Sequence, residues 1–194
     1  MLIPIFPLNV VLFPDGPLPL RIFETRYIDM VSECMKLDRP FGVLNVQDNF
    51  NVSEKPIYKI GTLAKINDFY QGSDGVLGIT VKGSQRFRMI SCEKEAKGLN
   101  IANIELIEEE KPFTLPDDFK FLSEMLENVL EELGLLYEGQ DKHYDDAVWV
   151  SHRFFEVLPI DIAQKQASLE SSNTTERLNQ IVKLLESYRG SGNH

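Results

Sequence analysis

The sequence predicts an α+β protein with a β-rich amino-terminal part and a helical carboxy-terminal part. Residues 1 to about 110 hold several short apolar runs divided by turn residues, which is typical of a small barrel or sandwich. From about residue 114, apolar residues recur at helical spacing instead. The polar, proline-containing stretch Glu108–Pro112 separates the two patterns. We therefore expect two subdomains, 1–112 and 113–194.

Prolines crowd the beginning of the chain, at positions 4, 7, 14, 17 and 19. Because proline lacks a backbone N–H, this stretch cannot be one long central strand. Two short buried strands are expected instead, Val10–Phe13 and Leu18–Phe23, with Asp15-Gly16 as the turn between them. Each run ends in a phenylalanine that we expect in the core. From Glu24 to Met35 the apolar spacing becomes helical, and the residues expected on one face are Tyr27, Ile28, Val31, Cys34 and Met35.

The rest of the β-rich part contains short apolar runs of strand length. They are Phe41–Val46, Lys59–Phe69, Val76–Val81, Arg86–Ser91 and Ile101–Ile107. The segment Lys82–Gln85 is expected to form a turn or a bulge. Within Lys59–Phe69, the candidates for burial are Ile60, Leu63, Ile66 and Phe69.

Four helices are expected in the second part. Thr114 can cap the first, whose apolar stripe runs from Phe119 to Leu133 and ends near Gly134. The next two cover Asp145–Val157 and Asp161–Glu170, with Asp161 expected as a cap. Asn173 followed by Glu176 is typical of the start of a last helix, with Leu178, Ile181, Val182, Leu185 and Tyr188 facing inward.

Composition places the chain among ordinary folded proteins, because 43% hydrophobic and 26% charged residues exclude intrinsic disorder. No apolar run is long enough to span a membrane, and the amino terminus lacks the pattern of a signal peptide. Cys34 and Cys92 are too few for a disulfide framework. We therefore expect a cytoplasmic protein that contacts no membrane.

The net charge of −10 is concentrated in one stretch, since residues 105–138 hold eleven acidic residues and only two lysines. The simplest interpretation is a solvated helix face with an acidic linker. The alternative is a surface that repels nucleic acid or attracts basic partners. Affinity for phosphates needs clustered Lys and Arg, and the sequence contains no such cluster. No nucleic-acid partner is therefore expected.

A search of the sequence for catalytic motifs finds none. It contains no Gly-Lys-Ser or Gly-Lys-Thr phosphate loop, no HExxH motif and no nucleophile elbow. The three histidines are not spaced with cysteines as metal ligands, and His152 is expected to be structural or exposed. We therefore expect no metal, no cofactor and no enzymatic activity.

Three ordered groups of motifs carry a resemblance to a known family. The first is Pro4–Asn9, Leu12–Pro14, Leu18–Glu24 and Arg26-Tyr27; the second is Ile60–Ile66, Asp74-Gly75 and Gly83–Phe87; the third is Leu158–Asp161, Lys165-Gln166, Leu169-Glu170 and Glu176–Leu178. In this order they resemble the amino-terminal substrate-binding domain of the ATP-dependent protease Lon. The resemblance implies a PUA-like pseudo-barrel followed by a helical bundle. It also implies a stand-alone bacterial member that lacks the ATPase and Ser-Lys protease modules.

The resemblance implies a non-enzymatic module that binds unfolded or extended polypeptide, or an adaptor for a protease or another protein. It also allows a homodimer. Two alternatives stay open: a PUA-like nucleic-acid-binding protein and an unrecognised hydrolase. The first would use exposed aromatic residues as a stacking platform, with Tyr58, Phe69, Tyr70 and Phe87 as candidates. The acidic charge favours a core role for these rings.

Four residues are candidates for a polypeptide-binding groove: Arg21, Glu24, Arg26 and Tyr70. The first three surround the junction of the second strand and the first helix. Extended peptides bind either by backbone pairing or through apolar pockets with a polar rim, and short strand edges protected by proline favour the second mode. The structural alternative is that Arg21 and Glu24 form an ion pair that holds this corner.

Overall fold

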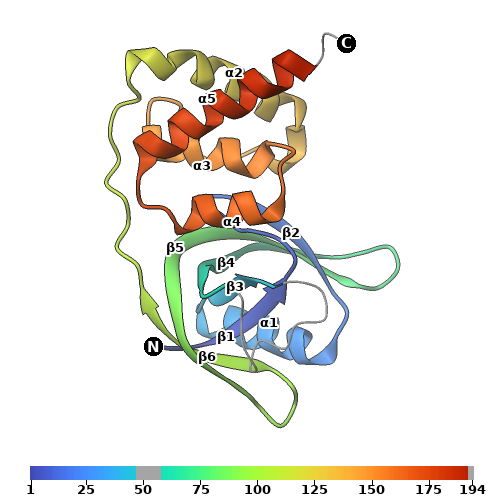
Figure 1. The fold of residues 1–194 in the computed structure, drawn as a ribbon. Helices are drawn as coiled ribbons and strands as arrows, with labels where there is room; N and C mark the ends of the chain where they lie inside the picture. The colour runs from blue at the N-terminus through green and yellow to red at the C-terminus, as the bar shows by residue number, and fades with distance from the viewer. Residues whose placement is uncertain (47–57, 192–194) are drawn as a thin grey trace. The chain divides into compact units, whose positions relative to one another are not determined.

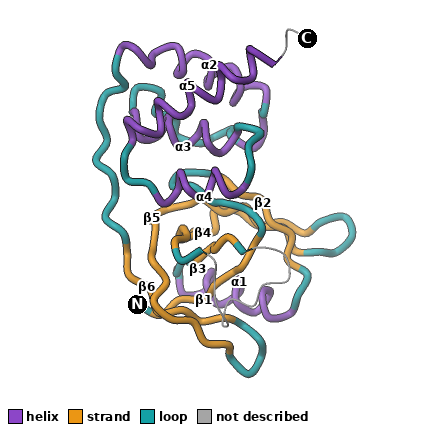
Figure 2. Tube along the Cα trace, in the orientation of Figure 1, coloured by secondary structure: helices purple, strands orange, loops and turns teal. Residues whose placement is uncertain are grey.

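The computed structural model describes residues 1–46 and 58–191. The chain divides into two units, Met1–Glu109 (unit 1) and Glu110–His194 (unit 2). Figure 1 labels the helices and strands, and Figure 2 colours them by type. In the described residues of unit 1 lie strands β1 to β6 and helix α1, and the other labelled helices lie in unit 2. The α+β class is therefore confirmed.

Unit 1 is built on one mixed sheet. Its elements are β1 (Leu2–Leu8), β2 (Pro17–Ile22), α1 (Thr25–Leu37), β3 (Phe41–Asn45), β4 (Ile60–Gln71), β5 (Leu77–Lys94) and β6 (Asn100–Leu106). The strand order is β2-β5-β4-β3-β1-β6, and β6 also pairs with β5. The pairings among β5, β4, β3, β1 and β6 therefore form a closed circuit, with β2 added along β5 (Figure 1).

The first strand differs from the prediction, because β1 runs through Pro4 and Pro7. Pro4 pairs only with β6, where it lies opposite Ile101. Pro7 pairs only with β3, where it lies opposite Leu44. Each proline thus has a partner strand on one side only. No second neighbouring strand therefore lacks a hydrogen bond because of the missing N–H.

The strand predicted at Val10–Phe13 is wrong, since these residues form no strand. They are held by other contacts: Leu12 accepts a hydrogen bond on its carbonyl from Thr62 Oγ1 at 2.6 Å, and Phe13 accepts one from Gly16 N at 3.0 Å. Phe13 is fully buried as predicted, but Phe23 is 75% exposed. The sequence shows that this run is apolar but not how its backbone is paired.

The two strands predicted on either side of Lys82–Gln85 are one long strand, β5. The irregularity lies in the pairing: Thr62 of β4 is opposite Arg86, whereas Ala64 is opposite Gly83. One β4 residue, Leu63, therefore faces two residues of β5. This is a β-bulge, which bends a strand without ending it.

Helix α1 covers one face of the sheet. Its buried residues Tyr27, Met30, Val31 and Cys34 follow a helical stripe, and the ring of Phe6 stacks on that of Tyr27 with centroids 4.2 Å apart. The apolar cluster between α1 and the sheet includes Phe6, Ile22, Phe41, Ile79 and Val81. A second apolar cluster, which includes Ile3, Ile5, Leu44, Leu63, Phe87 and Ile104, packs within the strand circuit.

The described part of unit 2, residues 110–191, contains four α-helices and two short 3₁₀ turns; the helices are α2 (Lys120–Glu132), α3 (Ala147–Val157), α4 (Ile162–Glu170) and α5 (Thr174–Ser191). α3 packs against α2, α4 and α5, and most of its residues are buried on every side. The predicted caps at Asp161 and Asn173 are confirmed, with Asn173 Oδ1 accepting from Glu176 N at 3.1 Å. Thr114 caps no helix and pairs with Asp146 in an isolated bridge.

Candidate functional site

Two of the predicted site residues, Arg21 and Tyr70, lie in one row across three strands. Arg21 of β2 and Tyr70 of β4 are both opposite Gly78 of β5. A Cβ on Gly78 would collide with the Tyr70 ring, so the ring lies directly over the glycine. Arg21 forms an ion pair with Asp74 in the β4–β5 turn. The Val76 N–H and then the Arg21 guanidinium lower the pKa of the Asp74 carboxyl, so this carboxyl is ionised at neutral pH.

The other two, Glu24 and Arg26, form a pair at the start of α1. Arg26 Nη2 lies 2.7 Å from Glu24 Oε2, and Arg26 Nη1 donates to Gly98 O at 2.8 Å. The guanidinium also lies over the Tyr27 ring, 4.7 Å from its centroid. Arg26 therefore ties the helix to the β5–β6 turn.

The predicted ion pair between Arg21 and Glu24 is wrong, because each residue has a different partner. Arg21 still belongs to a strand that pairs with β5, so its side chain reaches the β4–β5 turn. Glu24 already belongs to the helix terminus, two residues before Arg26. The four candidates thus form two separate pairs rather than one constellation.

The outer edge of β2 is poorly suited to pairing with another strand. Gly83 N donates to Gly16 O at 2.8 Å, so alternate residues from Gly16 onward direct their backbone groups toward β5. Pro17 and Pro19 therefore occupy the outward positions, where they offer no N–H. Proline at such positions is a common protection of an exposed edge.

The end of β4 beyond its pairing with β3 is protected in a different way. A register shift lies between Ile66 and Asp68, and the N–H of Phe69 donates to the neighbouring Asp68 Oδ1 at 2.8 Å. The donor that an added strand would need is therefore already occupied. Together with β2, this favours recognition through side-chain pockets over backbone pairing.

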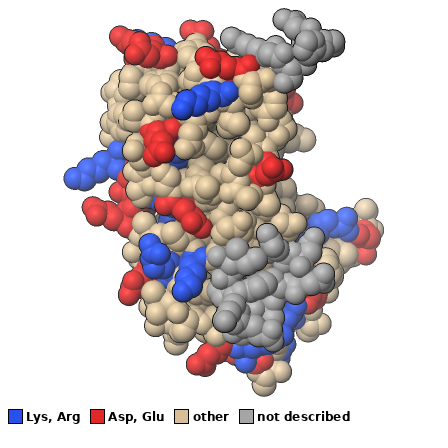
Figure 3. Space-filling view, in the orientation of Figure 1, with Lys and Arg blue, Asp and Glu red and all other residues tan. Residues whose placement is uncertain are grey.

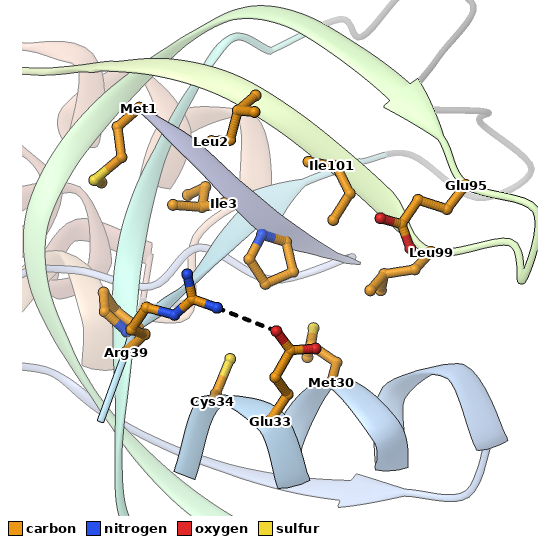
Figure 4. A pocket seen from close by; sticks show the side chains of 12 residues that line it. Met1, Leu2, Ile3, Met30, Glu33, Cys34, Arg39, Glu95, Leu99 and Ile101 are labelled. Atoms are coloured by element: carbon orange, nitrogen blue, oxygen red, sulfur yellow. Dashed lines mark hydrogen bonds and ion pairs between the residues drawn. The ribbon is translucent and has the colours of Figure 1, made fainter. Parts of the chain in front are cut away.

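Two pockets flank α1. The β1 pocket has a volume of about 370 Å³ and lies between α1, the start of β1 and the β5–β6 hairpin (Figure 4). It is lined by Met1, Leu2, Ile3, Pro4, Met30, Glu33, Cys34, Arg39, Pro40, Glu95, Leu99 and Ile101. The β4 pocket has a volume of about 190 Å³ and is lined by Cys34, Met35, Asp38, Arg39, Lys65, Ile66, Asn67, Asp68 and Phe69. Cys34 and Arg39 line both.

The polar groups at both pockets are largely engaged in ion pairs. Arg39 Nη2 donates to Glu33 Oε1 at 3.1 Å, and Lys65 Nζ lies 3.5 Å from Asp38 Oδ1. Burial raises the pKa of the Cys34 thiol to about 11, so it stays protonated at neutral pH and is a poor nucleophile. The arrangement suits binding of apolar groups rather than covalent chemistry.

Unit 2 contains a buried polar cluster that superficially resembles catalytic machinery. Arg177, with no exposed surface, makes two bonds to Glu110, Nη1 to Oε1 at 3.0 Å and Nη2 to Oε2 at 2.7 Å. Its Nε donates to Ser151 Oγ at 3.1 Å, and His152 Nε2 lies 3.7 Å from Glu110 Oε1. Ser151 Oγ donates to the carbonyl of Val148 rather than to a histidine. The burial of the cluster and the bond from Ser151 Oγ to a backbone carbonyl favour a structural role.

Other classes of site find no support in the described part of the chain. Among residues 1–46 and 58–191, no group of His, Cys, Asp and Glu side chains is arranged to hold a metal ion. None of the helices described is both long and apolar enough to cross a bilayer. On the face drawn in Figure 3, the Lys and Arg side chains that the structure describes are dispersed among acidic ones and form no continuous basic stripe.

Sequence reasoning missed the residues that line the two pockets. Phe69, predicted to be buried, is 58% exposed at the β4 pocket. Arg39, Glu95 and Leu99 carry no local motif, because their proximity depends on how α1 and the β5–β6 hairpin pack on the sheet. The turn residues Lys97-Gly98 are the available signal, since they mark a hairpin that places Glu95 and Leu99 side by side.

Comparison with known proteins places these features in a family. A family model for the ATP-dependent protease La (LON) substrate-binding domain matches residues 2–187. Lon protease 1 of Bdellovibrio bacteriovorus is 37% identical over 111 residues, covering 55% of this chain and 14% of that protein. Lon protease of Cytophaga hutchinsonii is 27% identical over 199 residues, covering 95% and 24%. The chain therefore spans about a quarter or less of the length of these relatives.

Solved structures agree with the sequence matches. The crystal structure of the Lon N-terminal domain protein from Xanthomonas campestris has a TM-score of 0.77 and 31% identity, covering 94% of this chain and 98% of that one. The N-terminal domain of the Mycobacterium avium complex Lon protease has a TM-score of 0.64 and 15% identity, covering 94% and 97%, and shows the shared fold alone. The chain belongs to the family of the Lon substrate-binding domain.

Proposed function

We propose that this protein is a non-enzymatic module that binds unfolded or extended polypeptide. The observation that carries the proposal is the match of the substrate-binding-domain model to residues 2–187. The 31% identical Lon N-terminal domain protein supports it, since that structure is covered over 98% of its length. The partner would be a client chain, and the module would hand it to a protease or serve another protein as an adaptor.

The geometry of unit 1 supports the same function. Two pockets flank α1: the β1 pocket has a mostly apolar lining, and the β4 pocket has a mixed lining that includes Ile66 and Phe69. Arg39 and Lys65, the basic side chains at these pockets, lie in ion pairs. The free edges of β2 and β4 are protected against strand addition. A client would therefore be held by its apolar side chains, a mode that tolerates many sequences because the hydrophobic effect is not directional.

Several finer features belong to this proposal. The closed circuit of strand pairings supports a PUA-like pseudo-barrel, and the packing of α3 against three other helices supports a helical bundle. We place the border between the subdomains near Glu110 rather than after residue 112, because Glu110 pairs with Arg177. Arg21, Glu24, Arg26 and Tyr70 are proposed to contribute to client binding. A cytoplasmic location and a homodimer are also proposed.

The test is fluorescence anisotropy with a labelled, permanently unfolded protein such as reduced and carboxymethylated α-lactalbumin. Saturable binding that depends weakly on salt is expected, because apolar contacts dominate. Labelled single-stranded RNA serves as the control ligand. Binding to RNA alone, falling steeply with salt, would replace this proposal with the nucleic-acid alternative, and no binding to either ligand would reject polypeptide recognition.

A further inference from the structure

The β1 pocket has the properties of a specific binding site. Its volume of about 370 Å³ lies within the range of ligand pockets in proteins. Most of its lining is apolar and comes from three separate places: the first residues of β1, one side of α1, and the hairpin residues Leu99 and Ile101 (Figure 4). Met30 and Cys34 belong at the same time to the buried cluster under α1, so the floor of the pocket is fixed by the core.

The charges at the opening are unequal. Among the side chains that line the pocket, Glu33 and Glu95 contribute two carboxylates and Arg39 one guanidinium. The amino group of Met1 donates to Asn103 Oδ1 and Ile104 O on β6. Arg39 bonds to Glu33 at 3.1 Å (Figure 4), which leaves the Glu95 carboxylate as the excess charge. Glu95 is exposed, and the hydrogen bonds that hold it involve its backbone: its N–H donates to Leu99 O at 2.8 Å and its carbonyl accepts from Gly98 N at 2.8 Å. The side chain is therefore accessible to a ligand above the apolar floor.

A cationic partner fits this rim better than an anionic one. An added anion would meet Glu95 and would compete with Glu33 for Arg39, whereas an added cation meets a carboxylate with no cost to the existing pair. The whole chain has a net charge of −10, which also favours the approach of basic ligands.

We propose that the β1 pocket binds apolar side chains of an extended polypeptide segment that is flanked by lysine or arginine, with Glu95 as the residue that recognises the basic flank. This inference rests on the proposed polypeptide-binding function and adds the site and the sequence preference. It assigns Leu99 and Ile101 to the apolar contact.

The test uses two labelled peptides that share a Phe-Leu core, one flanked by lysines and one by glutamates. Three variants are compared with the unaltered protein. Leu99→Glu places a charge in the pocket, Glu95→Lys reverses the sign of the charge at the pocket opening, and Glu105→Lys is the control. Glu105 is exposed on β6 and does not line the pocket. Its substitution changes the net charge by the same amount as Glu95→Lys.

The unaltered protein is expected to bind the lysine-flanked peptide more tightly. Glu95→Lys should weaken that binding about two- to fivefold, as expected for an exposed ion pair, and should reduce the preference between the peptides. Leu99→Glu should weaken binding of both peptides by about tenfold or more. Glu105→Lys should reproduce the unaltered preference. A thermal unfolding curve for each variant separates loss of binding from loss of fold, and Glu95→Lys carries the test if Leu99→Glu does not fold.

If all folded variants bind the peptides with equal affinity, the β1 pocket is not the binding site, whereas the proposed polypeptide-binding function stands. An equal effect of Glu95→Lys and Glu105→Lys would overturn the role of Glu95, because net charge alone would then account for the preference. Tighter binding of the glutamate-flanked peptide would overturn the proposed preference for lysine or arginine next to the apolar segment. Failure of the unaltered protein to bind either peptide or the unfolded protein would reject the proposed function itself.

Discussion

Unit 1 and unit 2 fill their interiors with different chemistry. The two clusters inside unit 1 are apolar, and its buried arginine, Arg86, lies at the β-bulge beside them. In unit 2, two of the largest fully buried side chains are Arg153 and Arg177, each paired with a glutamate. One unit is stabilised mainly by non-directional burial and the other also by directional bonds between buried charges.

This difference bears on where a ligand can bind. An apolar cluster can extend to the surface and form a pocket, as it does where Met30 and Cys34 reach the β1 pocket. In unit 2, Glu110 of the buried pair also lines a pocket, of about 380 Å³, together with Lys111, Phe113 and residues 172–175. A ligand that displaced Glu110 there would leave Arg177 as an uncompensated buried charge. We therefore place the proposed client site at the β1 pocket of unit 1, whose lining is mostly apolar, rather than at the polar pocket beside Glu110.

The strongest test of the comparison removes one partner of the buried pair in unit 2. Glu110→Ala leaves Arg177 buried without its carboxylate and should lower the free energy of unfolding by about 3–5 kcal/mol. Trp149, the one tryptophan of the chain, lies buried in unit 2 and reports its urea transition by fluorescence. The double variant Glu110→Leu with Arg177→Met should lose less stability than Glu110→Ala. A loss below about 1 kcal/mol for Glu110→Ala would show that this pair does not hold unit 2 together.

A second test overfills the apolar interior of unit 1. In Gly61→Ala the new Cβ would lie 2.7 Å from Phe87 Cζ and against the Val43 carbonyl, so the substitution should cost about 1–3 kcal/mol. Hydrogen exchange followed by mass spectrometry should show faster exchange in β3, β4 and β5. The Trp149 signal of unit 2 should be less affected.

Phe87→Leu added to Gly61→Ala serves as the control for this clash. The smaller side chain should recover part of the lost protection, giving a coupling energy that is absent for unrelated sites. Simple additivity of the two substitutions would contradict a direct contact between the Gly61 position and the Phe87 ring.

A third test uses pH to probe the other buried pair of unit 2. Burial raises the pKa of Glu156 to about 7, against the opposing effects of Arg153 and Lys165. The folded protein therefore binds a proton more tightly than the unfolded chain, so the unfolding free energy should fall by about 1–3 kcal/mol as pH rises from about 5 to above 7. The Trp149 urea transition at several pH values measures this slope. Glu156→Gln should flatten it, whereas Glu176→Gln, at an exposed position in the first turn of α5, should keep it.

The smallest expected effect concerns a helix cap rather than an interior. Asn173 Oδ1 accepts from the backbone N of Glu176 at the start of α5, and Asn173→Ala should cost about 1 kcal/mol. Asn179→Ala is the matched control, because that side chain lies exposed and donates to Thr175 O within the same helix. Equal losses for the two variants, measured by thermal unfolding, would remove the special role of the cap.

Local patterns predicted the helices well. Tyr27, Val31 and Cys34 were expected on the buried face of α1 and lie there, although Met30 takes the place expected for Ile28 and Met35. The ends of α3 and α4 agree with the predicted spans within two residues. Helical spacing and caps are set by neighbours in the sequence, so a single chain contains the information.

The strand pairing and the pocket lining could not be predicted from local patterns, because they depend on residues far apart in the sequence. Pro4 and Pro7 could be accepted in β1 only because each faces one partner strand, which the local sequence does not reveal. The pockets arise where α1 meets β1, β4 and the β5–β6 hairpin, and no motif at Arg39 or Leu99 marks that meeting. Arg21 and Tyr70 were selected separately, and the shared row at Gly78 emerges only from the strand register.

The protected edges of β2 and β4 also affect how the protein would behave in contact with unfolded chains. A protein that gathers such chains raises their local concentration, and exposed strand edges would then act as seeds on which client segments assemble into β-aggregates. Pro17 and Pro19 withhold the donors on the outside of β2, and Asp68 occupies the Phe69 donor on β4. With the proposed function, the molecule would bind apolar segments by their side chains without offering these backbone donors to an amyloid-like stack.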